Sequence, residues 1–298
     1  MRKLVVLLLL FGTIAHSQTQ GFAKSSDGTP IFYRTFGSGK PILIINGGPG
    51  MNSNGFEALA KKLGEHNLTI IYDQRATGKS KLEKPSEKNI SMDLMVDDIE
   101  QLRQKLGFDS WIVLGHSFGG MLASYYTSLH PEKVEKLILS SSGGIDLELL
   151  NHRDLVQKNL DKTYRDSLAY WDKKIRKGDT TYVTKLGRAR ALAPAYVVNP
   201  KFYAMLAKRL SQSDRALNTL VWLDMNRMHF DCSEKLKTFT KPVLILQGKR
   251  DIIPAELAER AHKVLQNSRV VLMENCSHYG WLDAENVYFS EIGNFLKP

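Results

Sequence analysis

The 298-residue chain contains very little cysteine. Its two cysteines, Cys232 and Cys276, stand far apart in the sequence. So few thiols exclude a small domain built on a framework of disulfide bonds. The two thiols either pair in an oxidising compartment or serve as small buried hydrophobic residues, and the sequence leaves both interpretations open.

Signatures of metal and nucleotide binding are also missing. The chain has no H-E-x-x-H motif, and its cysteines and histidines lack the spacing of a zinc site. Gly78-Lys79-Ser80 matches the end of a phosphate-binding loop, but the first glycine of that motif would fall at position 73, which is Asp73. We therefore expect no metal ion and no organic cofactor.

Long apolar runs are absent after the first 17 residues. Those residues begin with Arg2 and Lys3, continue with the apolar stretch 4–14, and end in the small-x-small pattern Ala15-His16-Ser17. This is the pattern of a cleaved signal peptide, since the apolar stretch is too short to span a bilayer. We expect export to a bacterial periplasm or the medium, with no stable membrane anchor after cleavage. The alternative is an uncleaved anchor.

Acidic residues are scarce in one region. Residues 151–230 hold 16 Lys and Arg against 7 Asp and Glu, in a chain whose formal net charge is +10. The excess indicates a solvated helical surface, an acidic substrate, or adhesion to an anionic surface. No nucleic-acid-binding motif accompanies the charge, so we expect no nucleic-acid partner. The sequence does not determine the oligomeric state.

Short runs rich in Val, Ile and Leu alternate with amphipathic segments of helical length. This alternation predicts an α/β fold, with a mostly parallel central sheet and helices on both faces. Residues 145–231 contain no convincing strand and predict a helical lid (cap) inserted into a core made of 18–144 and 232–298. The expected strands are 31–36, 41–46, 68–73, 110–114, 135–140, 242–247 and 269–273.

The motif G-x-S-x-G follows the fourth expected strand, at Gly115-His116-Ser117-Phe118-Gly119. A helical pattern begins directly after it. Glycines on either side of a serine let a strand turn sharply into a helix, so that the hydroxyl stands exposed at the end of the sheet. This context predicts that Ser117 is a nucleophile.

A serine nucleophile needs a base and an acid that orients it, in the chain order Ser, Asp or Glu, His. Asp251 follows the sixth expected strand and His278 follows the seventh, which places both at the same edge as Ser117. We expect a Ser117–His278–Asp251 triad. Other acids and bases are less well placed, namely Asp283, His130 and His262.

The oxyanion of an acyl-transfer reaction needs preorganised donors. The backbone N–H of Phe118, next to the nucleophile, is one candidate. The loop Asn46-Gly47-Gly48-Pro49-Gly50 follows the second expected strand and supplies the other, with Gly48 preferred and Gly47 next.

These motifs resemble the α/β-hydrolase superfamily over nearly all of the expected mature chain. Within it, the chain is most similar to proline iminopeptidase-type serine peptidases. That group shows H-G-G-P-G, D-Q-R-G-x-G-R-S and G-x-S-x-G-G, which here read N-G-G-P-G, D-Q-R-A-T-G-K-S and G-H-S-F-G-G. Three positions depart from the group: Asn46 replaces histidine, Ala76 replaces glycine, and Phe118 stands where tryptophan is common.

The resemblance implies an aminopeptidase that releases an N-terminal residue, such as proline, from short peptides. Members of the group hold the free amino group with carboxylates of the lid or loops. Asp224 is the only acidic residue within 215–228, so Asp224 and Asn46 are the expected substrate-binding residues, while Ile252 follows the expected catalytic aspartate. The alternatives are a carboxylic ester or lactone hydrolase of the same fold, and a non-catalytic binding protein.

Overall fold

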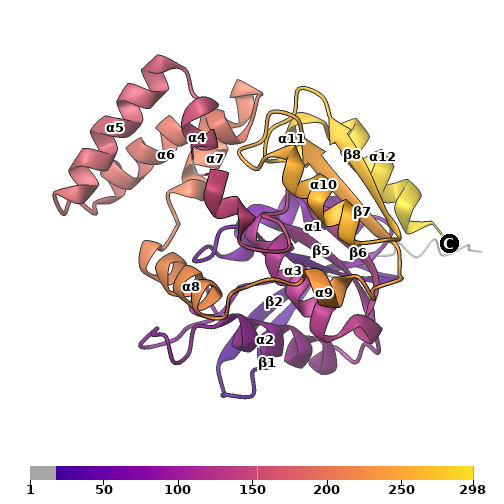
Figure 1. Cartoon of the computed structure of the whole chain (residues 1–298). Helices are drawn as coiled ribbons and strands as arrows, with labels where there is room; N and C mark the ends of the chain where they lie inside the picture. Colours follow the sequence, from indigo (N-terminus) through magenta and orange to yellow (C-terminus); the bar gives the residue numbers. More distant parts are fainter. Residues whose placement is uncertain (1–17, 153, 298) are drawn as a thin grey trace, which may run out of the picture.

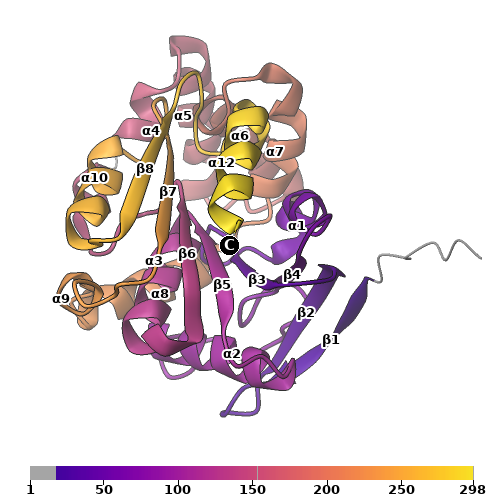
Figure 2. The ribbon, with the colours of Figure 1, turned by 90° about the vertical axis from the view of Figure 1, so that its right-hand side faces the viewer.

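A computed structural model describes residues 18–152 and 154–297. Eight strands form one sheet in the order β1-β2-β4-β3-β5-β6-β7-β8 (Figure 2). All pairs from β4 to β8 are parallel, whereas β1 and β2 pair antiparallel with their neighbours. The expected signal peptide lies outside the described residues. The strands are β1 (Thr19–Lys24), β2 (Pro30–Gly37), β3 (Pro41–Ile45), β4 (Leu68–Tyr72), β5 (Trp111–His116), β6 (Val134–Ser140), β7 (Val243–Gly248) and β8 (Ser268–Met273).

The predicted α/β fold is confirmed, and each of the seven expected strands is present within a few residues of its predicted bounds. Strands β3 to β7 are almost wholly buried, as expected for apolar runs in a parallel sheet covered on both faces. Strand β1 was not predicted. Its sequence TQGFAK is polar and mostly exposed, because it forms the edge of the sheet.

Two apolar cores lie on opposite faces of the sheet. One core lies under α2 (Met92–Lys105), α3 (Phe118–Leu129), α9 (Ser233–Leu236) and α10 (Ala255–Val264). The other lies under α1 (Glu57–Leu63), α11 (Gly280–Asp283) and α12 (Glu285–Leu296). Cys232 belongs to the first core and Cys276 to the second, and both are free and buried. The sheet therefore separates the two thiols.

The inserted segment forms helices over the carboxyl ends of the strands (Figure 1). It leaves and re-enters the core at one point, where Asp146 and Asp231 form a β-bridge and Cys232 N–H donates to the Ile145 carbonyl oxygen at 2.8 Å. Its helices are α4 (Leu155–Lys158), α5 (Lys162–Arg176), α6 (Tyr182–Tyr196), α7 (Tyr203–Leu210) and α8 (Arg215–Arg227). Short 3-10 helices are η1 (Ser53–Phe56), η2 (Pro131–Lys133), η3 (Glu148–His152) and η4 (Pro200–Phe202).

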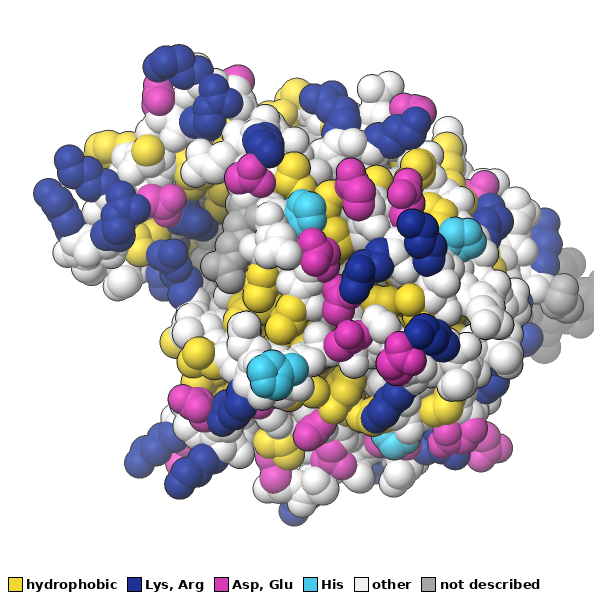
Figure 3. Space-filling view, in the orientation of Figure 1, with side chains coloured by type: hydrophobic (Ala, Val, Ile, Leu, Met, Phe, Trp, Pro, Cys, Tyr) yellow, Lys and Arg dark blue, Asp and Glu magenta, His cyan; other side chains and the backbone are white. Residues whose placement is uncertain are grey.

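Helix α6 was not among the expected helices, because Gly187 and Pro194 interrupt its pattern. The glycine has a packing reason: a Cβ at position 187 would lie 2.4 Å from the indole ring of Trp171 in α5. Lys and Arg side chains gather on the α5–α6 part of the lid, at the upper left of Figure 3. No helix within residues 18–152 and 154–297 is long and apolar enough to cross a membrane.

Candidate active site

Ser117 occupies a sharp turn between β5 and α3. Its backbone has φ 57° and ψ −124°, a conformation that non-glycine residues rarely adopt. The helix behind it packs very close to the sheet, because a Cβ at Gly119 would lie 2.1 Å from the carbonyl oxygen of Ile45 in β3. The turn therefore presents the serine hydroxyl above the sheet, as the motif predicts.

His278 and Asp251 lie together at the same edge of the sheet. The imidazole Nδ1 is 2.8 Å from Asp251 Oδ1, and the two side chains are 3% and 0% exposed. The carboxylate also accepts hydrogen bonds from the Ile253 N–H at 3.0 Å and from Gln247 Nε2 at 3.0 Å. These contacts hold Asp251 in one orientation, so that it can orient His278.

The pairing determines the tautomer of His278. A carboxylate only accepts, so Nδ1 carries a proton, and in the neutral ring Nε2 is then the atom that can accept one. Both Ser117 and Tyr196 line one cavity, and the Tyr196 ring meets the His278 ring edge-on with centroids 5.5 Å apart. His116, the residue before the serine, lies still closer, with ring centroids 4.6 Å from His278. His278 therefore packs against His116, which precedes Ser117 in the chain, and against Tyr196, which lines a cavity together with Ser117.

His116 is a site residue that the sequence did not identify. It is 1% exposed, and neither ring nitrogen has a hydrogen-bond partner among the described residues. Burial, together with the neighbouring His278 and Arg209, holds its pKa well below the usual value of 6.5. A neutral His116 adds no charge beside His278. Its only signal in the sequence is its position inside the G-x-S-x-G motif.

The candidate oxyanion loop follows β3 and approaches the serine closely. A Cβ at Gly47 would lie 2.6 Å from Ser117 Cβ, and Gly48 has φ +74°, so both positions require glycine. Phe118 begins α3, and the first N–H groups of a helix have no acceptor within it. Gly48, Ser117 and Phe118 line the same cavity. The structure thus brings together the residues expected to bind the oxyanion.

This cavity, of about 570 Å³, lies between the serine and the lid. None of its described lining residues is acidic, and Ile252, next to Asp251, is one of them. Of the expected triad only Ser117 lines it, and its other polar lining side chains are His152, Tyr196, Asn218, Thr219 and Asn226. Its apolar side chains include Met121, Leu149, Leu150, Val156, Trp222 and Leu223. The cavity suits an uncharged, largely apolar group.

The two expected substrate-binding residues are engaged elsewhere. Asp224 Oδ2 accepts the N–H of Met92, the first residue of α2, at 2.8 Å, and a carboxylate there stabilises the helix N-terminus. Asn46 Nδ2 donates to the carbonyl oxygens of Gly47 at 3.1 Å and Met51 at 3.0 Å. Neither residue lines the cavity at Ser117. Asp224 therefore supports α2, and Asn46 supports the candidate oxyanion loop.

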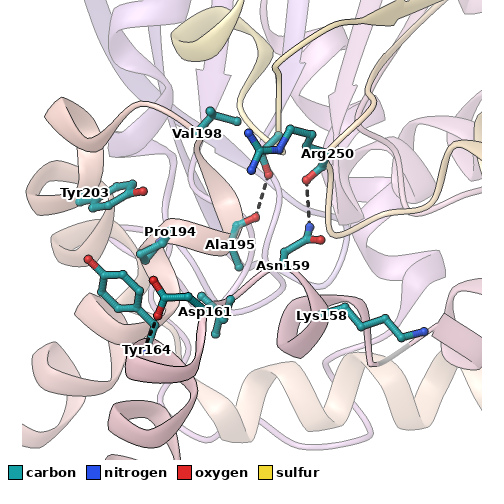
Figure 4. A pocket seen from close by; sticks show the side chains of 11 residues that line it. Lys158, Asn159, Asp161, Tyr164, Pro194, Ala195, Val198, Tyr203 and Arg250 are labelled. Atoms are coloured by element: carbon teal, nitrogen blue, oxygen red, sulfur yellow. Dashed lines mark hydrogen bonds between the residues drawn. The ribbon is translucent and has the colours of Figure 1, made fainter.

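A second cavity, of about 400 Å³, lies where the lid crosses the loops that carry the acid and the base (Figure 4). Arg250 and Ser277, which directly precede Asp251 and His278, line it. Asn159 Nδ2 donates to the Arg250 carbonyl oxygen at 2.9 Å, as Figure 4 shows. Ser117 does not line this cavity, and the two cavities have no lining residue in common.

The other acid and bases considered from the sequence, Asp283, His130 and His262, have partners outside the candidate triad. The Asp283 carboxylate accepts four hydrogen-bond contacts, at 2.9–3.1 Å, from the backbone N–H groups of Val198, Asn199 and Ser277. His262 Nδ1 lies 2.7 Å from the Ser268 hydroxyl on the exposed side of α10. His130 stacks on Tyr126 at the far end of α3, with ring centroids 5.4 Å apart. Among the described residues, His278 pairs with a buried carboxylate, whereas neither His130 nor His262 forms an ion pair.

The family model of the alpha/beta hydrolase fold matches residues 40–285. The chain belongs to this family. Within it the chain is proline iminopeptidase-like: it is 26% identical over 293 residues to "Proline iminopeptidase" of Heyndrickxia coagulans, covering 94% of this chain and 99% of the relative. It is also 26% identical to "Proline iminopeptidase" of Saccharolobus solfataricus, covering 89% and 87%.

Solved structures share the fold. An esterase from Exiguobacterium antarcticum superposes with a TM-score of 0.72 at 22% identity, covering 93% of this chain and 99% of the esterase. Proline iminopeptidase of Mycobacterium smegmatis superposes with a TM-score of 0.69 at 21% identity, covering 93% and 97%. At these identities the superpositions establish the fold, and enzymes of both names have it.

Proposed function

We propose that this hydrolase acts through an acyl-enzyme formed on Ser117. The observation that carries the proposal is the buried hydrogen bond of 2.8 Å between His278 Nδ1 and Asp251 Oδ1. It leaves Nε2 of the imidazole as the basic atom, at the sheet edge where Ser117 stands on its strained turn. Without that pair, Ser117 would be an ordinary alcohol.

The reaction has two halves. Ser117 Oγ attacks the carbonyl carbon while His278 Nε2 takes its proton, and the N–H groups of Phe118 and Gly48 stabilise the oxyanion. His278 then returns the proton to the leaving group, and the bond to that group breaks. Water repeats these steps on the acyl-enzyme and releases the acid and free Ser117.

Two substrate classes have support. Release of an N-terminal residue from short peptides is supported by the names of the relatives. A carboxylic ester with an uncharged acyl group is supported by the cavity, because a buried ammonium needs a carboxylate partner and the described lining offers none. The geometry favours the ester, and a lactone would fit the same chemistry.

The test is a panel of release rates on the purified protein. It compares proline and alanine 4-nitroanilides with free amino termini, their N-acetylated forms, and 4-nitrophenyl butyrate. We expect the butyrate to be hydrolysed with the highest kcat/KM, and N-acetylation to change the anilide rates little. Fast cleavage restricted to free-amine proline substrates would overturn the ester assignment and establish the aminopeptidase.

Ser117→Ala is the control for the whole panel. The variant should lose all release above the uncatalysed rate while its Tm stays near that of the wild type. A wild-type protein as inactive as Ser117→Ala, yet able to bind small ligands, would support the non-catalytic binding protein instead.

We also propose export, supported by the pattern of residues 1–17. Expression of the full chain in a bacterium, followed by fractionation and N-terminal sequencing, tests it. We expect a periplasmic or secreted protein that begins at Gln18. A cytoplasmic protein that retains residues 1–17 would refute this proposal.

A further inference from the structure

Arg209, in α7 of the lid, is a buried cation with no carboxylate in direct contact, although Asp73 and Tyr279 lie near enough to favour its charged form. The residue is 7% exposed, and no carboxylate among the described residues lies within 4.0 Å of its guanidinium. Burial lowers its pKa below the usual value of an arginine. A buried guanidinium without a carboxylate is costly, so its retention requires an explanation beyond packing.

The partners of Arg209 are carbonyl oxygens of the candidate oxyanion loop. Nη2 donates to the Gly47 oxygen at 3.4 Å, and Nη1 donates to the Asn52 oxygen. The guanidinium also lies over the Phe56 ring, 5.6 Å from its centroid. It therefore bridges two points of one loop, five residues apart, and fixes the distance between them.

The Gly47 carbonyl has a special position. It belongs to the same peptide unit as the Gly48 N–H, the expected second donor to the oxyanion. Asn46 Nδ2 also donates to this oxygen, at 3.1 Å, so two donors polarise one carbonyl. Hydrogen bonds to a carbonyl strengthen the N–H at the other end of its peptide, and a cationic donor does so most.

We infer that Arg209 is a positioning residue for the oxyanion hole, which orients the Gly47–Gly48 peptide and strengthens its N–H toward the developing negative charge. The inference rests on the proposed serine-hydrolase function. It makes the lid part of the catalytic apparatus, since α7 supplies the guanidinium. Two further lid contacts end on neighbouring loop carbonyls: Asp214 N–H donates to the Gly50 oxygen at 3.0 Å, and Asn218 Nδ2 to the Pro49 oxygen at 3.3 Å.

The consequence is specific to the transition state. Loss of Arg209 removes no group that touches the substrate, so binding of the ground state should change little, whereas stabilisation of the oxyanion should weaken. Removal of a whole oxyanion donor costs about 10²–10³-fold in kcat in other hydrolases. Loss of Arg209 leaves the Gly48 N–H present and changes only its orientation and polarity. We therefore expect a loss of roughly tenfold or more in kcat.

The experiment measures kcat and KM for 4-nitrophenyl butyrate with wild type, Arg209→Met and Arg209→Lys. Arg165→Met is the matched control, because Arg165 is another lid arginine that donates to a backbone carbonyl, that of Leu160, at an exposed position. Titration of the folded sites with a fluorophosphonate normalises kcat. Phenylboronic acid, which forms a tetrahedral adduct with a reactive serine, serves as the transition-state probe.

We expect Arg209→Met to lose at least tenfold in kcat with KM within about twofold, and to bind phenylboronic acid more weakly by a similar factor. Arg209→Lys should recover part of kcat, since one ammonium keeps the charge but cannot bridge both carbonyls. Arg165→Met should match the wild type.

Two results would overturn the inference. One is a normalised kcat within twofold of wild type in Arg209→Met, with only Tm lowered, which would mean a purely structural role. The other applies if Arg209→Met does not fold: an undiminished kcat in Arg209→Lys would then also mean that Arg209 has a purely structural role. A wild type no more active than Ser117→Ala would instead refute the proposed function itself, and this inference with it.

Discussion

The backbone N–H of His278 donates to the carbonyl oxygen of Tyr196 at 3.0 Å, and this bond joins the candidate base to the last residue of lid helix α6. The Asp283 carboxylate connects the lid and the loop of the base a second time, through hydrogen bonds. It accepts from the N–H groups of Val198 and Asn199 in the lid and from Ser277 in the loop of the base. Hydrogen bonds thus connect the lid to the loop that carries His278, and the contacts of Arg209 connect it to the candidate oxyanion loop.

Asp283→Ala tests how much the hydrogen bonds between the lid and the loop of His278 contribute to stability. The change leaves three backbone N–H groups without their acceptor, and hydrogen bonds to a charged group contribute about 1.5–3 kcal/mol each. Neighbouring contacts relax, so we expect a total loss of about 2–4 kcal/mol in the free energy of unfolding. Urea denaturation measures it. A change below about 0.5 kcal/mol would show that the carboxylate is dispensable.

Asp251→Asn tests the orientation of the base. An amide at this position can present its NH₂ group to Nδ1 and hold His278 in the wrong tautomer, which costs about 10⁴-fold in kcat in serine proteases. We expect a loss on the order of 10³–10⁴-fold here, with little change in Tm. The kinetics of 4-nitrophenyl butyrate hydrolysis give the answer.

The matched control is Asp224→Asn. This carboxylate stabilises the N-terminus of α2 and does not line the cavity, so its loss should lower stability by about 1 kcal/mol and leave kcat within twofold. Equal losses of kcat in the two variants would contradict the assignment of Asp251 as the orienting acid.

Much of the fold and of the candidate site could be predicted from the sequence, for identifiable reasons. Strands such as β5 and β7 are uniformly apolar because both faces of the sheet are covered. Asp251 and His278 each follow such a strand, and the carboxyl ends of parallel strands share one edge. Local pattern and topology therefore place both residues near Ser117 before any coordinates are known.

The remaining features depend on contacts that no local pattern records. Counting acidic residues selects Asp224, but a count does not say which face of α8 carries it, and the structure turns it toward α2. Arg209 is one of many cations in a basic segment, and only the packing of α7 distinguishes it. Helix α6 is stabilised by tertiary packing of Gly187 on Trp171, where its own periodicity is poor.

His116 predicts a pH dependence of stability. Its folded pKa lies below the unfolded value of about 6.5, so the unfolded chain binds more protons at acid pH. The contribution of His116 to the free energy of unfolding is therefore fully present above pH 6.5. It is lost as the pH falls below that value, by at most about 1.4 kcal/mol per pH unit. In His116→Phe, which keeps an aromatic ring, the free energy of unfolding should decline less between pH 7.5 and 5.5. His66→Gln, at an exposed position, is the control, and an unchanged slope in His116→Phe would refute the assignment.

The neutral lining of the cavity predicts that one carboxylate can change its substrate. Ile252 lines the cavity next to the orienting acid, so Ile252→Glu would place a negative charge there, while Ile252→Gln adds nearly the same shape without charge. We expect the glutamate variant to lower KM for alanine or proline 4-nitroanilides with free amino termini by roughly tenfold relative to Ile252→Gln, since an ammonium then gains a partner. N-acetylated substrates should show no such gain, because acetylation removes the charge. Equal KM values in the two variants would mean that the amino group of these substrates does not reach this wall of the cavity, and that the absence of a carboxylate there does not exclude an aminopeptidase.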